Sequence, residues 1–215
     1  MFRKADHQTI KVPVVYKDEV AIVIEQLNLP DRSGCKKIPK RFHQTWNTEN
    51  IPGTQAKYIV SWMKYHPDWE YWFWTADQID EFVNRRYPKY IEMFRRYPQY
   101  MQRADSMRYF VLYEFGGVYA DLDVSALRSW EDRLTSSHTL LIPEDHEVHT
   151  VVAHGLESIT LSAIIMSTPG HRFFAYVIKS LPAFDKITKS DDLLGDKFVN
   201  VTEKYMELDG PNPDF

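Results

Sequence analysis

The stretch that decides the fold is GGVYADLDV, residues 116–124. It reads as a buried strand that ends in two carboxylates one residue apart. Because alternate side chains of a strand share a face, the pattern predicts that Tyr119, Asp121 and Asp123 point one way and the apolar residues between them the other. Two neighbouring carboxylates repel each other. Burying them costs roughly several kcal/mol unless a cation or a hydrogen-bond donor compensates the charge. Magnesium or manganese suits such oxygen ligands and takes further oxygens from a substrate phosphate, so the stretch favours a diphosphate-bearing ligand.

A lone Asp-x-Asp is more typical of a strand that runs into a polar turn, so the flanking residues matter. The apolar spacing upstream predicts a helix over residues 100–115, which the two glycines end. Asp105 and Arg108 lie three apart on it and are therefore surface neighbours. By themselves they would form a helical ion pair. Because the helix leads directly into the carboxylate strand, the pair is expected at the same cleft, as an anion clamp beside a hydroxyl acceptor.

Three blocks in the same order carry a family resemblance: KIPKRFHQTWNTENIP, SWMKYHPDWEYWFWT and QRADSMRYFVLYEFGGVYADLDV. Together they resemble glycosyltransferase family 32, and within it the mannosyltransferases that modify inositol phosphoceramide. The similarity covers roughly residues 36–182 and is more specific than the Asp-x-Asp pair alone. It implies a GT-A-type, Rossmann-like domain that binds a nucleotide sugar, and retention of configuration at the anomeric carbon.

The resemblance also implies site roles. Asp121 and Asp123 would hold Mn²⁺ or Mg²⁺ on the nucleotide diphosphate, with Asp123 as the direct ligand. Asp105 would accept hydroxyls of the donor sugar, and Arg108 would contact sugar and phosphate. Tyr119 would lie at the nucleotide. We therefore assign Asp105, Arg108 and Asp123 as catalytic.

The edge of the first strand completes the predicted donor site. By resemblance, Thr45 and Trp46 support the nucleotide base, and Ala104 belongs to the donor site beside Asp105. A base stacked on Trp46 would be physically reasonable, but a core aromatic is an equally good interpretation in a chain with six tryptophans. His43, on the same strand, is expected to be a packed or hydrogen-bonded histidine rather than a ligand, and His171 to cap the helix that follows it.

The remaining elements alternate. Strands are predicted over residues 41–46, 70–75, 138–145 and 162–168, and helices over 54–65, from Thr75 onward, over 89–97 and up to residue 181. The inward face of the helix over 54–65 is predicted to include Ala56, Ile59, Val60 and Met63. Alternation predicts an α/β fold with a mainly parallel central sheet flanked by helices, and ligands at the carboxyl ends of the strands. We divide the chain into an N-terminal extension (1–35), the transferase domain (36–182) and a polar C-terminal segment (183–215) in which the family domain is cut short.

Composition fits this picture. The chain has 215 residues, 44% of them hydrophobic, one cysteine and a formal charge of −4, which gives no electrostatic case for a nucleic-acid partner. No stretch approaches a membrane span or a signal peptide, so the chain itself reads as soluble. The resemblance instead implies that the protein works in the Golgi or at another membrane-associated site. Contact with the membrane is then expected only through the acceptor or through segments outside this sequence.

The predicted activity is transfer of a hexose, with mannose favoured, from GDP-mannose or a UDP-sugar to a hydroxyl of a glycan or glycolipid such as inositol phosphoceramide. Two alternatives stay open. VYADLDVS also resembles the first motif of haloacid-dehalogenase-like phosphatases, with Asp121 as nucleophile, Asp123 as acid, and Lys179 and Asp191-Asp192 as the later partners. The chain could also be a catalytically idle module that binds nucleotide sugar or carbohydrate.

Overall fold

The computed structural model describes residues 9–11, 37–134, 138–144 and 161–183. Five strands form one sheet in the order β4-β2-β5-β7-β6. The first three of these strands are parallel, whereas β7 runs antiparallel to β5, and β6 antiparallel to β7. The sheet is therefore mixed. The prediction of a mainly parallel sheet was wrong for β7 and β6, which pair with their neighbours in the antiparallel direction. The strand bounds are β2 (Arg41–Thr45), β4 (Glu70–Trp74), β5 (Gly117–Ala120), β6 (Leu140–Leu141) and β7 (Ile164–Ser167).

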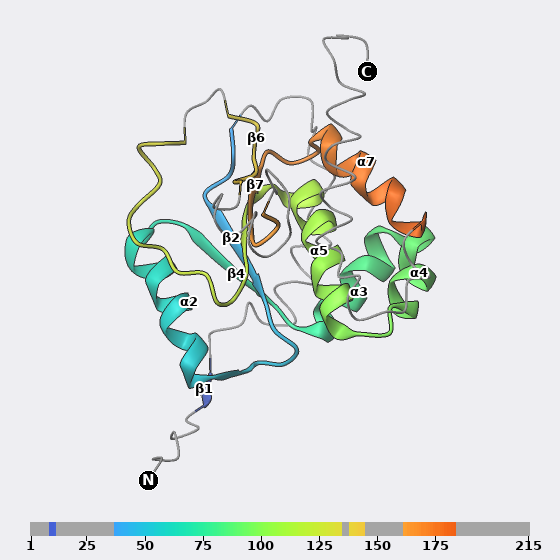
Figure 1. Cartoon of the computed structure of the whole chain (residues 1–215), viewed down its shortest axis with the longest axis horizontal. Coiled ribbons are helices and arrows are strands. Elements are labelled where there is room, and N and C mark those ends of the chain that lie inside the picture. The colour runs from blue at the N-terminus through green and yellow to red at the C-terminus, as the bar shows by residue number, and fades with distance from the viewer. Residues whose placement is uncertain (1–8, 12–36, 135–137, 145–160, 184–215) are drawn as a thin grey trace, which may run out of the picture.

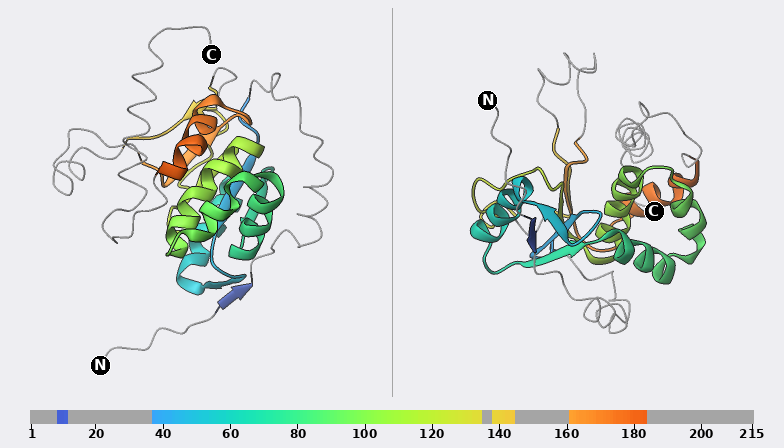
Figure 2. Two further views of the ribbon diagram at one scale, coloured as in Figure 1. Left: turned by 90° about the vertical axis from the view of Figure 1, so that its right-hand side faces the viewer. Right: turned by 90° about the horizontal axis from the view of Figure 1, so that it is seen from below.

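Helices cover both faces of the sheet. Figure 1 and Figure 2 show α2 on one side and α3, α4, α5 and α7 together on the other. A short antiparallel pair of strands, β1 and β3, adjoins α2 and was not predicted. The bounds are α2 (Gly53–Tyr65), α3 (Ala76–Arg86), α4 (Ile91–Arg96), α5 (Tyr100–Phe115), α7 (Arg172–Ser180), β1 (Thr9–Lys11) and β3 (Asn50–Pro52), with 3₁₀ turns at Pro88–Tyr90 and Leu181–Ala183.

Strand β5 is buried on both faces. Tyr119 belongs to the large hydrophobic cluster under α3, α4, α5 and α7, whereas Val118 and Ala120 belong to the cluster on the α2 side with Phe42 and Trp62. Alternate residues of one strand thus contribute to two separate cores. This double packing fixes the position at which the chain leaves the sheet, immediately before Asp121.

The junction between α5 and β5 depends on two glycines. Gly116 and Gly117 adopt φ values of +61° and +98°, which L side chains rarely adopt. A Cβ atom on Gly117 would lie 2.6 Å from the carbonyl oxygen of Arg41, so β2 approaches too closely for any side chain. The glycine pair therefore turns the chain from the motif helix straight into the central strand.

Several predicted elements are confirmed. The motif helix has the predicted bounds, Thr75 forms a capping box with Gln78, and the His171 imidazole accepts a hydrogen bond from the Phe173 N–H. On α2, however, Trp62 is buried and Val60 is 59% exposed. The α2 prediction was therefore wrong at Val60, and Trp62 belongs to the inward face instead. The strand predicted over 138–145 is only two residues long within the described part.

The predicted terminal segments, 1–35 and 183–215, lie almost wholly outside the described residues. Within the part of the chain that is described, no helix is both long and apolar enough to cross a membrane.

Candidate active site

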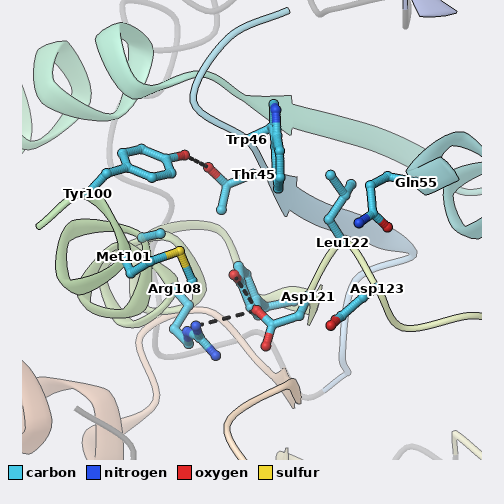
Figure 3. A pocket seen from close by; sticks show the side chains of 11 residues that line it. Thr45, Trp46, Gln55, Tyr100, Met101, Arg108, Asp121, Leu122 and Asp123 are labelled. Carbon is cyan, nitrogen blue, oxygen red and sulfur yellow. Dashed lines mark hydrogen bonds and ion pairs between the residues drawn. The ribbon is translucent and has the colours of Figure 1, made fainter. Parts of the chain in front are cut away.

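A pocket of about 170 Å³ opens at the carboxyl ends of β2 and β5. It receives side chains from the end of β2, from the end of β5 and the turn after it, from the first turn of α2 and from the amino-terminal part of α5, as Figure 3 shows. Seven of the eight predicted site residues line this pocket. The eighth, Asp105, accepts a hydrogen bond from Arg108, which lines it. The lining residues are Thr45, Trp46, Gln55, Tyr100, Met101, Ala104, Arg108, Tyr119, Asp121, Leu122 and Asp123.

Arg108 is the buried cation of this pocket. Its side chain is only 3% exposed, and its guanidinium donates to the Asp105 carboxylate and to the carbonyl oxygen of Ser162. The nearer oxygen of Asp121 lies 3.4 Å from Arg108 Nη2, an ion pair drawn in Figure 3. The pair of Asp105 and Arg108 was expected on a helix surface, but α5 packs so deeply that the guanidinium is enclosed.

Burial and charge act in opposite directions on these groups. Burial lowers the pKa of Arg108. The nearby Tyr119, Asp121 and Asp105 raise it by more than burial lowers it, so the guanidinium stays charged. Burial raises the pKa of Asp105; Arg108 partly offsets this and Asp121 adds to it. The guanidinium carbon also lies 4.6 Å from the centre of the Tyr119 ring, a cation–π contact.

Asp121 is held by its neighbours through one of its two oxygens. The Tyr119 hydroxyl donates to Oδ1 at 2.9 Å, and Arg108 faces the same oxygen. Burial raises the pKa of Tyr119 well above its ordinary value, so the phenol remains a donor. No hydrogen bond or ion pair to Oδ2 of Asp121, or to either oxygen of the exposed Asp123, occurs within the described segments. These oxygens are therefore open for a ligand.

The two carboxylates do not continue the strand. The strand ends at Ala120, and residues 121–124 form a turn closed by a hydrogen bond from the Val124 N–H to the Asp121 carbonyl. Asp121 and Asp123 therefore lie beyond the strand, which was not predicted. The expected common direction nevertheless holds, because Tyr119, Asp121 and Asp123 all line the pocket and the Tyr119 hydroxyl donates to Asp121.

Thr45 and Trp46 form the wall at the end of β2. Thr45 is buried, and its hydroxyl donates to the Trp74 carbonyl at 2.9 Å and lies 3.1 Å from the Tyr100 hydroxyl. Trp46 is half-buried: it packs on the cluster that contains Phe73 and Leu122 and also lines the pocket. The interpretation as a core aromatic thus accounts for one side of Trp46, and support of a nucleotide base stays a prediction for the side that lines the pocket.

Four pocket residues were not identified from the sequence: Gln55, Tyr100, Met101 and Leu122. Leu122 was visible only as the apolar residue between two carboxylates. The other three lie in the first turns of helices whose amino ends face the carboxyl ends of parallel strands. Their position at the amino ends of helices that face the strand ends was the sequence signal that could have identified them as pocket residues.

The donor atoms fit a hard divalent cation. Asp121 and Asp123 offer carboxylate oxygens, the ligands that magnesium and manganese prefer, and these ions commonly take further oxygens from water and phosphate. Over the described residues, no group of three or more His, Cys, Asp or Glu is arranged to hold a metal ion. The two carboxylates would hold the ion together with oxygens from the ligand.

Comparison with known proteins agrees with this geometry. Residues 52–141 match the family described as "Glycosyltransferase sugar-binding region containing DXD motif". The chain belongs to this family of DXD-motif glycosyltransferases.

Individual relatives are more specific. The chain is 34% identical over 153 residues to inositol phosphoceramide mannosyltransferase 1 of Schizosaccharomyces pombe, covering 70% of this chain and 44% of that protein. It is 33% identical over 182 residues to mannosyl phosphorylinositol ceramide synthase SUR1 of Saccharomyces cerevisiae, covering 84% of this chain and 44% of that protein. The chain thus spans less than half the length of these two relatives.

A solved structure supports the fold. PaToxG glycosyltransferase superimposes with a TM-score of 0.57 at 16% identity, over 88% of this chain and 78% of that one. This likeness shows that the α/β architecture with its mixed sheet is shared.

Proposed function

We propose that residues 36–182 form a GT-A-type, metal-dependent, retaining hexosyltransferase. The donor is a nucleotide-diphosphate hexose, with mannose favoured, and the acceptor is a hydroxyl of a glycolipid of the inositol phosphoceramide class. The observation that carries this proposal is the enclosed Arg108, which is paired with Asp105 and shares one pocket with Asp121 and Asp123. The mannosyl and glycolipid parts rest on the names of the relatives.

Charge balance explains why such a pocket needs a metal. Asp105 and Asp121 face the Arg108 guanidinium, and Asp123 lines the same pocket without pairing with it, so carboxylates outnumber the cation and would repel a diphosphate. Asp121 Oδ2 and Asp123 would hold the divalent ion. When bound, that ion supplies Lewis-acid stabilisation of the negative charge on the departing diphosphate.

The chain's own residues then position the donor. Asp105 uses Oδ1 to bind Arg108, which leaves Oδ2 to accept sugar hydroxyls. Arg108 is held rigidly and stays charged, and it stabilises charge on the leaving phosphate without reorganising. Trp46 supports the nucleoside, the role for which its partly exposed ring is suited.

The bond changes are those of a group transfer. The bond between the anomeric carbon and the β-phosphate oxygen breaks, a bond to the acceptor oxygen forms, and the acceptor proton passes to the departing phosphate. Of the carboxylates at or beside the pocket in the described segments, Asp105 is bonded to Arg108, and Asp121 and Asp123 are assigned to the proposed metal. With none placed as a covalent nucleophile, we propose attack from the same face of the sugar.

The proposal is tested by transfer and donor hydrolysis with GDP-mannose and UDP-hexoses in the presence of manganese. We expect turnover with one donor, its loss in excess chelator, and a fall of about a hundredfold or more in the variant Asp123→Asn, because the direct ligand loses its charge. Asp68→Asn, an exposed aspartate after α2, is the matched control and should retain activity. Unchanged turnover in Asp123→Asn would contradict the metal role.

The two alternatives predict other results. Donor binding without turnover would identify an idle module. Release of phosphate from a generic phosphoester would favour the phosphatase, against which the family match already argues. Its proposed Lys179 lies on α7 and does not line the pocket, and Asp191-Asp192 lies outside the described residues.

A further inference from the structure

Gln55 carries an unsatisfied acceptor at the wall of the donor pocket. Its side chain lines the pocket from the first turn of α2, beside Trp46 and Leu122. Its Oε1 is buried and has no hydrogen-bond partner among the described residues. A buried acceptor without a partner is destabilising, and such groups in a folded protein call for an explanation.

The position of Gln55 indicates which part of a donor it would meet. In Figure 3, Gln55 and Arg108 lie at opposite ends of the pocket lining, with Leu122 beside Gln55. Arg108 and its partner Asp105, which suit phosphate and sugar, lie at the other end, and Asp123 lies between Asp121 and Gln55 in this view. The surfaces next to Gln55 are the flat indole of Trp46 and the aliphatic Leu122, which suit a nucleoside rather than a phosphate.

We propose that Gln55 is a specificity-determining residue of the donor site, and that its side-chain oxygen accepts a hydrogen bond from an N–H or O–H of the nucleoside. The inference rests on the proposed function. The oxygen is buried in the wall of the pocket, and no partner for it lies within the described segments. Rotation about the side-chain torsions turns the amide towards the pocket and loses no existing hydrogen bond of this oxygen. A ligand donor therefore supplies a bond that the free protein lacks.

The chemistry of the amide limits the choice of ligand group. An amide oxygen is an acceptor only, so it would select an imino N–H of a base such as guanine or uracil, or a ribose hydroxyl. The imino N–H and the ribose hydroxyl each donate one hydrogen bond of comparable strength. The first belongs to the base of the nucleoside and the second to its sugar. A site built to hydrogen-bond a donor discriminates strongly against an analogue that lacks it, because the site's polar group is then left unpaired.

The test uses Gln55→Met, which keeps the length of the side chain and removes both amide atoms. We expect the Kd for GDP or UDP with manganese, measured by calorimetry, to rise about tenfold, the loss of one hydrogen bond of intermediate strength. The melting temperature of the ligand-free variant should stay the same or rise, because an unsatisfied buried acceptor has been removed. A merely structural glutamine would show the reverse: lower stability and little change in affinity. Lys57→Met, on the exposed face of the same helix, is the matched control and should alter neither.

Nucleotide analogues identify the ligand group. If the penalty of Gln55→Met persists with the 2′,3′-dideoxy nucleotide, the base supplies the donor; if it vanishes, the ribose does, and either result supports the inference. Equal affinity of wild type and Gln55→Met for both GDP and UDP overturns it. If the wild-type chain binds neither nucleotide with manganese, the proposed function fails, and the inference fails with it.

Discussion

Tyr119 joins the two charged parts of the pocket. Its hydroxyl donates to Asp121, its ring lies under the Arg108 guanidinium, and the whole side chain is buried in the main core. Its predicted place at the nucleotide stays a prediction. Because its hydroxyl is bonded to Asp121, we propose that it acts as a positioning residue that would fix the orientation of the proposed metal ligand.

We predict that Tyr119→Phe raises the manganese concentration needed for half-maximal activity about tenfold, because Asp121 loses its orienting donor. The phenylalanine ring keeps the packing and the contact with Arg108, so the free energy of unfolding should fall by only about 1 kcal/mol. A manganese titration of donor turnover measures the first quantity and denaturant unfolding the second.

Tyr87→Phe provides the comparison. Its hydroxyl also donates to a carboxylate, that of Glu114, but this pair lies away from the pocket. The manganese requirement should not change in this variant. A similar requirement in wild type and Tyr119→Phe would show that the phenol does not position the metal ligand.

At the scale of single residues, the sequence predicted which side chains are in contact but not how deeply they are buried. The spacing of Asp105 and Arg108 correctly placed them side by side on the helix, since i,i+3 contacts are local. It did not predict that Arg108 is enclosed or that the Ser162 carbonyl accepts from it, because that partner is 54 positions away along the chain. Gln55 was missed for the same reason: its unsatisfied oxygen is a property of packing.

Among the elements, β2 is linked to its surroundings by His43. Its Nε2 is bonded to the Gly116 carbonyl at the α5–β5 junction, and its Nδ1 accepts from the Trp74 indole on β4. This pattern needs the neutral imidazole with its proton on Nε2. Complete burial, aided by the charge of Arg41, lowers the pKa of His43 to about 3, and the bond to Gly116 only partly opposes the shift. The expectation of a packed histidine is confirmed.

This histidine predicts a pH dependence of stability. Below pH 6.5 the unfolded chain protonates His43 whereas the folded chain does not until about pH 3, so acidification favours unfolding across that window. Between pH 6 and 5 the His43 contribution should lower the free energy of unfolding by about 1 kcal/mol.

The variant His43→Gln isolates this contribution, since an amide can still donate to Gly116 but does not titrate. Urea unfolding at pH 6 and pH 5 should show a smaller loss of stability in the variant by about the same 1 kcal/mol. His66, whose pKa burial also lowers, is common to both proteins and cancels. Identical pH slopes would mean that His43 is protonated to the same extent in the folded and the unfolded chain, which would contradict its lowered pKa.

The elements that were predicted best are those with strong local signals. Helix α5 carries a long apolar stripe and a glycine stop, and α3 has a capping box, so their bounds follow from nearby residues. The direction of β7 does not, because hydrophobic alternation is the same for parallel and antiparallel strands. Strands β1 and β3 are three residues long, too short to show a period.

At the scale of the whole molecule, the site exists because two parallel strands end at one edge of the sheet. β2 and β5 are neighbours, and α5 returns its amino end to the same edge. General rules for α/β folds predicted this meeting place. They did not predict the order of the strands or the second antiparallel half, which are decided by contacts between distant segments.

The central claim is that an excess of negative charge around Arg108 makes binding of a nucleotide diphosphate depend on a divalent ion. Its most direct test is calorimetric titration of GDP and UDP into the protein, with manganese and with chelator, beside the variant Arg108→Met. We predict micromolar-range binding with manganese, binding at least about a hundredfold weaker in chelator, and a comparable loss in Arg108→Met. Equal affinity with and without the metal, or undiminished binding by Arg108→Met, would contradict the account.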